Sequence, residues 1–183
     1  MKAPEIIEIL SKNDLFEKTV TIPRNGFLKT SGSVDTDIYF IEKGSLRVFI
    51  MDENEERIIR FGYKNNIIVS LDSFLSGNPS EFYIQAIKKT TVKIIPKKSF
   101  LAFFNMEENL KVWAAILQDL VLQQVEREKD LLVSAPKIRY ERVLKRSPHL
   151  FQEIPNKHIA NYLRMTPETL SRLKNLDLNQ WLG

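Results

Sequence analysis

The chain has 183 residues, of which 43% are hydrophobic, so it can form one large domain or a sensor domain with a small second domain. It contains no cysteine, which excludes disulfides, cysteine-ligated iron–sulfur or zinc sites and thiol catalysis. The formal net charge of +4 is unevenly placed, because residues 135–183 carry nine Lys and Arg against four Asp and Glu. The excess positive charge therefore lies in the last quarter of the chain.

The first residues do not resemble a secretion signal, because Met1–Leu10 contains Glu5 and Glu8 and has no apolar core. No run of 18 apolar residues occurs in the chain, so the sequence predicts no membrane-spanning helix and no membrane partner. These observations favour a cytoplasmic protein.

Short strands separated by turns dominate the first hundred residues, after an amphipathic helix expected at residues 3–10. Gly44 lies in a tight turn between two of these strands. The close spacing predicts an antiparallel barrel or jelly roll, which makes the chain an α+β protein with a double-stranded β-roll over residues 1–106. The segments rich in β-branched and aromatic residues are 19–22, 27–29, 38–41, 46–50, 57–61, 82–87 and 91–95.

A long helix is expected next, because residues 107–132 contain neither Gly nor Pro. At about 1.5 Å per residue it spans roughly 39 Å, which is longer than the expected barrel. Its apolar residues follow a rough 4–3 spacing that can be buried on a second copy of the chain. We predict a homodimer that pairs through residues 107–134, and packing against the chain's own barrel is the alternative. The pairing residues would be Leu110, Trp113, Ala114, Leu117 and Val121.

Residues 134–136 are expected to form a hinge, and residues 137–147 a basic amphipathic helix. Residues 155–174 then show the pattern of two short helices joined by a tight turn. Thr166 suits the N-cap of the second helix, and Pro167 suits its first turn. The apolar positions that would pack the two helices together are Ile159, Ala160, Leu163, Leu170 and Leu173.

The second helix of this pair is polar and basic on its outer side, as in helices that enter a DNA major groove. The surplus of positive charge in the same region supports a helix-turn-helix DNA-binding domain over residues 135–183, because such a patch attracts phosphates. A plain helical hairpin is the alternative. One residue departs from the usual pattern: the turn commonly has Gly where this chain has Arg164, and a side chain there costs roughly 1 kcal/mol.

Two motifs near opposite ends of the chain carry a family resemblance. The strand–glycine–strand segment Ile38–Val48 and the helical segments Ile159–Leu163 and Glu168–Arg172 resemble, in this order, the Crp/Fnr superfamily of bacterial transcription regulators. Pro155–Ala160 and Thr166–Arg172 are most similar to its Bacteroidetes branch. The resemblance implies a homodimer that binds double-stranded DNA and reads a two-fold operator, with half-sites roughly 34 Å apart.

The resemblance also implies roles for residues of the second helix. Glu168 and Arg172 occupy base-reading positions, and Thr169 beside them can reach a base edge. An arginine can offer a fork to guanine O6 and N7, and a glutamate can accept a hydrogen bond from cytosine N4. Contacts to phosphates, which position the helix without reading sequence, are expected from Asn156, Lys157, Thr166, Ser171 and Lys174.

The cyclic-nucleotide pocket of the family is not reproduced in this sequence. That pocket requires Gly-Glu for the ribose and an Arg followed by Ser or Thr and Ala for the phosphate, and no arginine occurs between Arg60 and Arg127. A buried phosphate needs a charged donor, whereas Glu81 would repel it. We expect an unidentified small-molecule effector or none, and not cyclic AMP. The degenerate pocket positions are Ser70, Asp72, Ser80 and Glu81.

Cofactors and catalysis are not expected. An Fnr-type oxygen sensor needs cysteine, and both histidines, His149 and His158, lie outside the roll, which argues against a haem ligand there. Cupin enzymes share a double-stranded roll but hold a metal with histidines inside it, and residues 1–148 contain none. We therefore predict no cofactor, no metal and no enzyme activity. The alternative function is a protein-interaction or ligand-sensing module that does not bind DNA specifically.

Overall fold

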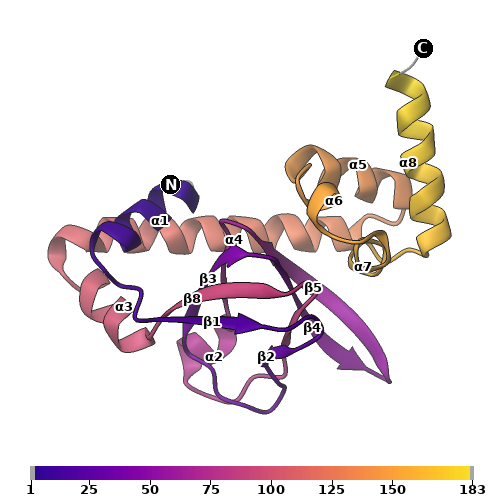
Figure 1. Cartoon of the computed structure of the whole chain (residues 1–183). Coiled ribbons are helices and arrows are strands. Elements are labelled where there is room, and N and C mark those ends of the chain that lie inside the picture. The colour runs from indigo at the N-terminus through magenta and orange to yellow at the C-terminus, as the bar shows by residue number, and fades with distance from the viewer. Residues whose placement is uncertain (1–2, 182–183) are drawn as a thin grey trace. The chain divides into compact units, whose positions relative to one another are not determined.

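The computed structural model describes the backbone of residues 3–181 and the side chains of residues 5–176. The chain divides into two compact units, the first made of residues 1–50 and 59–120, the second of residues 51–58 and 121–183. Figure 1 labels the elements along the chain. In order they are α1 (Ala3–Lys12), β1 (Lys18–Ile22), β2 (Phe27–Lys29), β3 (Ile38–Lys43), β4 (Ser45–Asp52), β5 (Glu55–Tyr63), β6 (Ile67–Val69), α2 (Leu71–Ser76), β7 (Tyr83–Ala86), β8 (Thr90–Ile95), α3 (Lys97–Phe104), a 3₁₀ turn (Glu107–Asn109), α4 (Leu110–Leu132), α5 (Pro136–Arg146), α6 (Leu150–Glu153), α7 (Asn156–Tyr162) and α8 (Pro167–Trp181).

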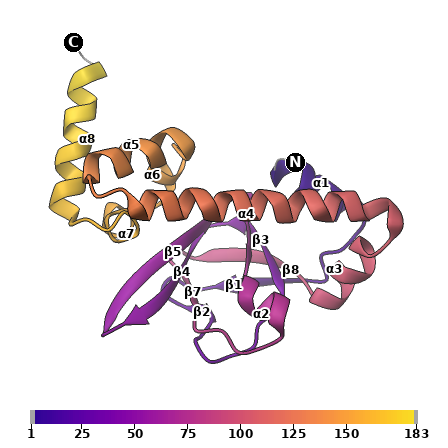
Figure 2. The same cartoon turned by 180° about the vertical axis from the view of Figure 1, so that it is seen from behind.

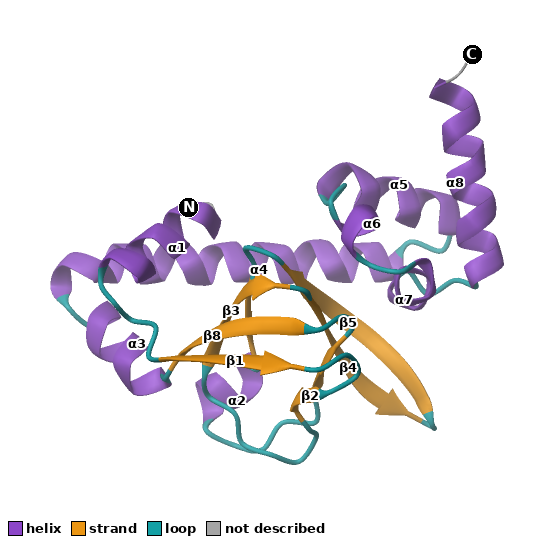
Figure 3. Ribbon diagram, viewed as in Figure 1, coloured by secondary structure: helices purple, strands orange, loops and turns teal. Residues whose placement is uncertain are grey.

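The strands form two four-stranded sheets, drawn in orange in Figure 3. One sheet has the order β1-β8-β3-β6 and the other β2-β7-β4-β5. The pairs β1–β8, β3–β8, β3–β6, β2–β7 and β4–β7 are antiparallel. The predicted α+β class with antiparallel sheets is confirmed.

The main core of the first unit contains inward-facing residues of both sheets. Tyr39 and Ile41 of β3 join Leu46 and Val48 of β4 in one cluster, and Ile41 and Leu46 are fully buried. Alternating apolar residues on a half-buried strand place every second side chain on one face, which is why both sheets bury an apolar side. The remaining members of this cluster are Ile22, Ile68, Ile84, Ala86, Val92 and Ile94.

A second, aromatic cluster in the same unit joins helices to the sheet edge. The Trp113 ring of α4 lies 5.2 Å from the Phe100 ring and 6.1 Å from the Phe104 ring of α3, measured between centroids. Phe74 of α2 lies 5.8 Å from Phe100. Aromatic pairs at these spacings add to the stability that area burial alone provides. The buried residues of α1 in this cluster are Ile6 and Leu10.

Helix α4 follows the expected long helix closely, with a 3₁₀ turn before it. Of the residues expected to pair two chains, Trp113 is instead packed inside the first unit. Leu110 is 47% exposed and Val121 is 61% exposed; Ala114 is exposed and Leu117 half-buried. A helix with apolar residues in solvent is a candidate for contact with another surface.

Three short elements were not expected from the sequence: β6, α2 and α6. Strand β6 has three residues and α6 has four, which is too few to display a hydrophobic period. Helix α2 has six residues and ends at Gly77, whose φ of 74° gives the left-handed conformation of a helix C-cap.

Helices α5–α8 form the core of the second unit, seen from behind in Figure 2. The residues predicted to pack the two last helices are buried: Ile159, Leu163 and Leu170 have no exposed surface. Tyr140 and Val143 of α5 are buried in the same unit. The helical spacing of apolar residues in the sequence therefore indicated this core correctly. Its other members are Leu150, Ile154, Ala160 and Leu173.

Gly44, in the turn between β3 and β4, has a φ of +93°, and a Cβ there would lie 2.5 Å from Oγ1 of Thr90 and 2.6 Å from the carbonyl oxygen of Lys89. Gly32 has a similar φ of +79° but open space around it. We expect Gly32→Ala to cost only the backbone strain of about 1–2 kcal/mol. Gly44→Ala should cost that strain and roughly 1–3 kcal/mol more from overlap. Urea unfolding of the two variants checks this, and equal losses would contradict it.

Candidate nucleic-acid interface

The turn between α7 and α8 has a regular hydrogen-bond pattern. The amide of Met165 donates to the carbonyl of Ala160 at 3.0 Å, and the amide of Arg164 donates to the carbonyl of Asn161 at 3.0 Å. These two bonds are those of a Schellman motif, whose central residue is left-handed and usually Gly. Here that residue is Arg164, with a φ of 53°. The departure noted in the sequence therefore falls on a positive-φ position.

Helix α8 begins with a side-chain cap. The amide of Thr169 donates to Oγ1 of Thr166 at 3.2 Å, as expected for an N-cap threonine. Hydrogen bonds to the Glu168 carboxylate, first from its own backbone amide and then from the Thr166 hydroxyl, hold the pKa of Glu168 below its usual value. An ionised carboxylate in the first turn of a helix is also favoured by the helix dipole. Glu168 is therefore held as an anion at the start of α8.

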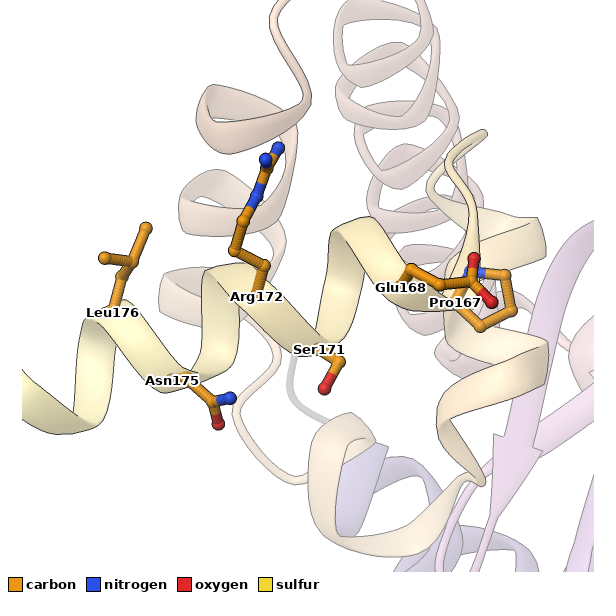
Figure 4. A pocket seen from close by; sticks show the side chains of 6 residues that line it. All are labelled: Pro167, Glu168, Ser171, Arg172, Asn175 and Leu176. Atoms are coloured by element: carbon orange, nitrogen blue, oxygen red, sulfur yellow. The ribbon is translucent and has the colours of Figure 1, made fainter.

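The outer face of α8 carries a shallow, open concavity of about 600 Å³. Figure 4 shows its lining side chains standing along the helix. Glu168 and Arg172, the expected base readers, both line it and both are exposed. They stand one helical turn apart, so a single face presents an anion and a guanidinium together. The full lining is Pro167, Glu168, Ser171, Arg172, Asn175 and Leu176.

Asn175 and Leu176 were not among the candidate residues, although both line the concavity. Asn175 follows Ser171 by four positions and Glu168 by seven, so helical spacing alone would have found it. An asparagine amide can bond adenine N6 and N7, which gives this position a base-reading capacity. Leu176 is 51% exposed and adds an apolar contact at the edge.

The other candidate residues lie around this face. Thr169 is half-buried and its hydroxyl lies 3.2 Å from that of Thr166, so it stands at the side of the concavity. The ammonium of Lys174 donates to Oδ1 of Asn156 at 3.0 Å, which joins α8 to the start of α7. Lys157 is exposed. Apart from Ser171, the expected phosphate contacts therefore lie outside the concavity lining.

Part of the positive charge counted in the sequence is neutralised or buried. Nε of Arg142 lies 2.9 Å from Oδ1 of Asp130, and Arg146 bonds the other oxygen of the same carboxylate. Nη2 of Arg142 also lies 3.2 Å from Oε2 of Glu126. Arg139 is only 9% exposed. Of the nine cations of residues 135–183, Arg139 is therefore buried, and Arg142 and Arg146 are neutralised by acidic partners. The free positive charge is smaller than the count implied.

The carboxylate of Asp130 has no exposed surface. Burial raises the pKa of a carboxyl group, but hydrogen bonds from Arg146 and Arg142 outweigh it and hold the pKa of Asp130 below its usual value. The ion pairs tie the end of α4 to α5 across the expected hinge at residues 134–136.

The tip of the β4–β5 hairpin belongs to the second unit and contacts α7. The amide of Ile58 donates to Oδ1 of Asn161 at 2.9 Å, and Nδ2 of Asn161 donates to the carbonyl of Glu56 at 2.7 Å. The Asn161 side chain thus accepts one hydrogen bond from the backbone of β5 and donates one to it, as the backbone of a neighbouring strand would. Ile58 is fully buried. No sequence signal marked Asn161, because a single amide has no periodicity.

The expected effector positions lie in the first unit. Ser70 and Ser80 are 1% exposed, whereas Asp72 and Glu81 are exposed. Buried Lys29 was not among the candidates, and its ammonium donates to the carbonyls of Thr30 at 3.0 Å, Ser80 at 3.2 Å and Phe82 at 2.9 Å. An ammonium has three donors, so all are used. Burial lowers the pKa of Lys29, against the opposing effect of Asp35 and Asp72.

Two further properties hold for the part of the chain that the structure describes. No group of three or more His, Asp or Glu side chains there is arranged to hold a metal ion. None of its helices is both long and apolar enough to cross a membrane.

Comparison with known proteins supports the resemblance seen in the sequence. Residues 19–107 match the family model described as a cyclic nucleotide-binding domain. No curated protein sequence matches the chain. A mutant of CooA from Carboxydothermus hydrogenoformans has a similar structure, with a TM-score of 0.70 and 17% identity over 96% of this chain and 84% of CooA.

Two more solved structures have the same fold. FixK2 from Bradyrhizobium japonicum has a TM-score of 0.69 and 17% identity, over 89% of this chain and 85% of its own. The c-di-GMP responsive global regulator CLP of Xanthomonas campestris has a TM-score of 0.63 and 13% identity, over 98% of this chain and 93% of its own. Residues 19–107 are therefore similar to the cyclic nucleotide-binding domain family, and the chain shares its fold with these three regulators.

We expect Asp130→Asn to lower the free energy of unfolding at pH 7 by about 1.5–3 kcal/mol, because it removes a buried charge-assisted acceptor from two arginines. The native pKa is lowered, so the stability that Asp130 contributes is complete above its unfolded pKa of about 3.9 and is lost as pH falls through the native pKa. The difference between wild type and variant should therefore shrink in acid.

Urea unfolding at pH 7 and pH 3 measures this difference. Glu126→Gln is the matched control, because the Glu126 side chain is 38% exposed and solvent screens its ion pairs with Lys129, Arg142 and Arg146, so its loss should be small at both pH values. A loss for Asp130→Asn that is the same at both pH values would contradict the assignment of the effect to the ionised carboxylate.

Proposed function

We propose that this chain is a DNA-binding transcription regulator of the Crp/Fnr type and not an enzyme. The observation that carries the proposal is the outer face of α8, where Glu168 and Arg172 stand one turn apart on an exposed concavity. In this proposal α7 and α8 form a helix-turn-helix, and the first unit is a jelly-roll sensor. The match of residues 19–107 to the cyclic nucleotide-binding domain family and the fold shared with CLP, a global regulator, support this proposal.

Base recognition would follow from the chemistry of this face. A guanidinium can donate two parallel hydrogen bonds to guanine O6 and N7, and the ionised Glu168 can accept from cytosine N4. The pKa of Glu168 is lowered, which supports its role as an acceptor near neutral pH. Lys157 and Lys174 would contact phosphates and set the position of the helix. In the cell, such a protein works in the cytoplasm.

A homodimer is proposed to bring two copies of α8 to a two-fold operator. Exposed apolar residues of α4 support it: Leu110 is 47% exposed, and Val121 and Leu122 are 61% and 63% exposed. Side chains of this kind are stabilised when a second apolar surface covers them. Half-sites would then lie roughly 34 Å apart, one helical turn of DNA.

The sensor is proposed not to bind cyclic AMP. The described residues around Ser80 offer no free cation to a phosphate, because the ammonium of Lys29 is already bonded to three carbonyls. Glu81 is exposed in the same segment and would repel an anion. In this proposal the sensor domain either binds a different small molecule or has no effector.

We expect the wild-type protein to bind the DNA upstream of its own gene specifically, and Arg172→Ala to lose about 1–3 kcal/mol of binding free energy at the preferred site. Lys157→Ala should instead weaken binding to every sequence alike and reduce the salt slope by about 1, because it removes a phosphate contact. Fluorescence anisotropy over a salt series, with a scrambled duplex, measures both effects.

Equal losses on specific and scrambled DNA for Arg172→Ala would show that α8 does not read bases. Absence of any binding at low salt would favour the protein-interaction or ligand-sensing module instead. Lys137→Ala is the control, because Lys137 pairs with Glu141 on its own helix and belongs to no proposed DNA contact.

Isothermal titration of the full chain with cyclic AMP should give no saturable heat at micromolar concentrations. If binding occurs, Lys29 must release the carbonyls of Ser80 and Phe82, and Lys29→Met should then change the affinity. Saturable micromolar heat with the wild-type protein would refute this part of the proposal.

A further inference from the structure

Three consecutive backbone carbonyls at the end of α7 are each bonded by an arginine from an earlier helix. Nη2 of Arg127 donates to the carbonyl of Tyr162 at 2.7 Å. Nε and Nη2 of Arg139 donate to the carbonyls of Leu163 at 2.9 Å and Arg164 at 3.0 Å. The Schellman bonds use only the carbonyls of residues 160 and 161, so they provide no donor to the carbonyls of Leu163 and Arg164 at this helix end.

Arg139 also bonds the segment between α4 and α5. Its Nη1 donates to the carbonyls of Val133 at 2.6 Å and Ser134 at 3.0 Å. One guanidinium therefore joins two backbone segments that lie about thirty positions apart in sequence. A guanidinium has five N–H donors in a fixed plane, and four of them are used here. A lysine ammonium has three donors on one atom and cannot span both segments.

The turn that Arg139 binds contains a residue other than Gly, Arg164, at a position that favours Gly. Arg164 has a φ of 53°, a conformation that Gly adopts freely and other residues adopt at a cost. Nη1 of Arg164 is buried without a hydrogen-bond partner, so this nitrogen adds no bond that offsets the cost. The carbonyls on both sides of the strained residue's Cα are the ones that Arg139 binds. A cation at a helix C-terminus is also favoured by the helix dipole.

We propose that Arg139 is the positioning residue of the α7–α8 turn: it holds Arg164 in the left-handed conformation and thereby fixes the direction in which α8 leaves α7. The effect of Arg139 on DNA recognition rests on the proposed DNA-binding function, since the direction of α8 sets how Glu168 and Arg172 enter a DNA groove. The positioning role itself does not require that function for its test. Arg139 itself touches no DNA.

The first test is amide hydrogen exchange without DNA. In Arg139→Lys, the amides of Arg164 and Met165 should exchange at least about tenfold faster, because the turn they close is no longer held. The amide of Ser147, bonded to Val143 at the end of α5, should be unchanged. Adding Arg164→Gly should restore protection toward the wild-type level, because Gly adopts the turn without strain.

The second test is DNA binding. Arg139→Lys should lower the ratio of specific to non-specific affinity by about tenfold or more, with non-specific affinity unchanged because the charge is kept. The double variant Arg139→Lys/Arg164→Gly should recover most of that ratio. Arg142→Lys is the control on the same helix, since Arg142 bonds Asp130 and not the turn, and it should leave the ratio within about threefold.

The outcomes separate the two proposals. Unchanged exchange at Arg164 and Met165, or no recovery in the double variant, would overturn the positioning role of Arg139. Altered exchange in a chain that never discriminates DNA sequences would leave that role standing and overturn the proposed function. If Arg139→Lys alone does not fold, the double variant decides: a folded double variant supports the role, and an unfolded one overturns it.

Discussion

Buried backbone carbonyls must find donors, and this constraint organises the second unit. Helix α7 ends in a Schellman turn whose own bonds do not satisfy the carbonyls of Leu163 and Arg164. Arg139 reaches both from α5, and Arg127 reaches the neighbouring carbonyl of Tyr162 from α4. The guanidinium of Arg127 also lies 3.7 Å from the centre of the Tyr162 ring, so the same residue packs as well as donates. Arg127 and Arg139 are buried, and both donate hydrogen bonds to backbone carbonyls at the end of α7.

Buried acceptors, carbonyls and the Asp130 carboxylate alike, explain why a count of charges overstated the free positive charge of this region. Residues 135–183 hold nine cations, but Arg139 binds carbonyls, and Arg142 and Arg146 bind the buried Asp130. A sequence shows how many arginines a segment contains and not which of them are buried or paired with acids. Long charged side chains are usually exposed, so the default expectation fails where a helix end needs donors. The concavity on α8 is thus the part of the proposed interface that presents its charge outward.

Much of the fold followed from periodicity. The alternating strands, the long helix and the packing residues Ile159, Leu163 and Leu170 could be predicted because each repeats a spacing that burial imposes. The candidate site was predictable to the same extent: Glu168 and Arg172 were expected on an exposed face and lie there, while helical spacing would also have found Asn175. Contacts made by one side chain, such as Lys29 with Ser80, leave no pattern in a sequence. Trp113 was expected in a stripe that pairs two chains, and it packs against the aromatic cluster of its own unit, because helical spacing alone does not say which surface a stripe meets.

The pairing of Asn161 with the β4–β5 hairpin has a consequence for dividing the chain. The second unit is discontinuous, because it includes residues 51–58, the end of β4 and the start of β5, whereas the remaining parts of both strands belong to the first unit. A fragment that begins at residue 121 would contain all of α5–α8 and still lack the amide of Ile58 and the carbonyl of Glu56 that Asn161 binds. Its Asn161 amide would be left to water, and the apolar surface that Ile58 covers would be uncovered. A cut at residue 121 therefore does not isolate the second unit, because that unit is made from two separate stretches of the chain.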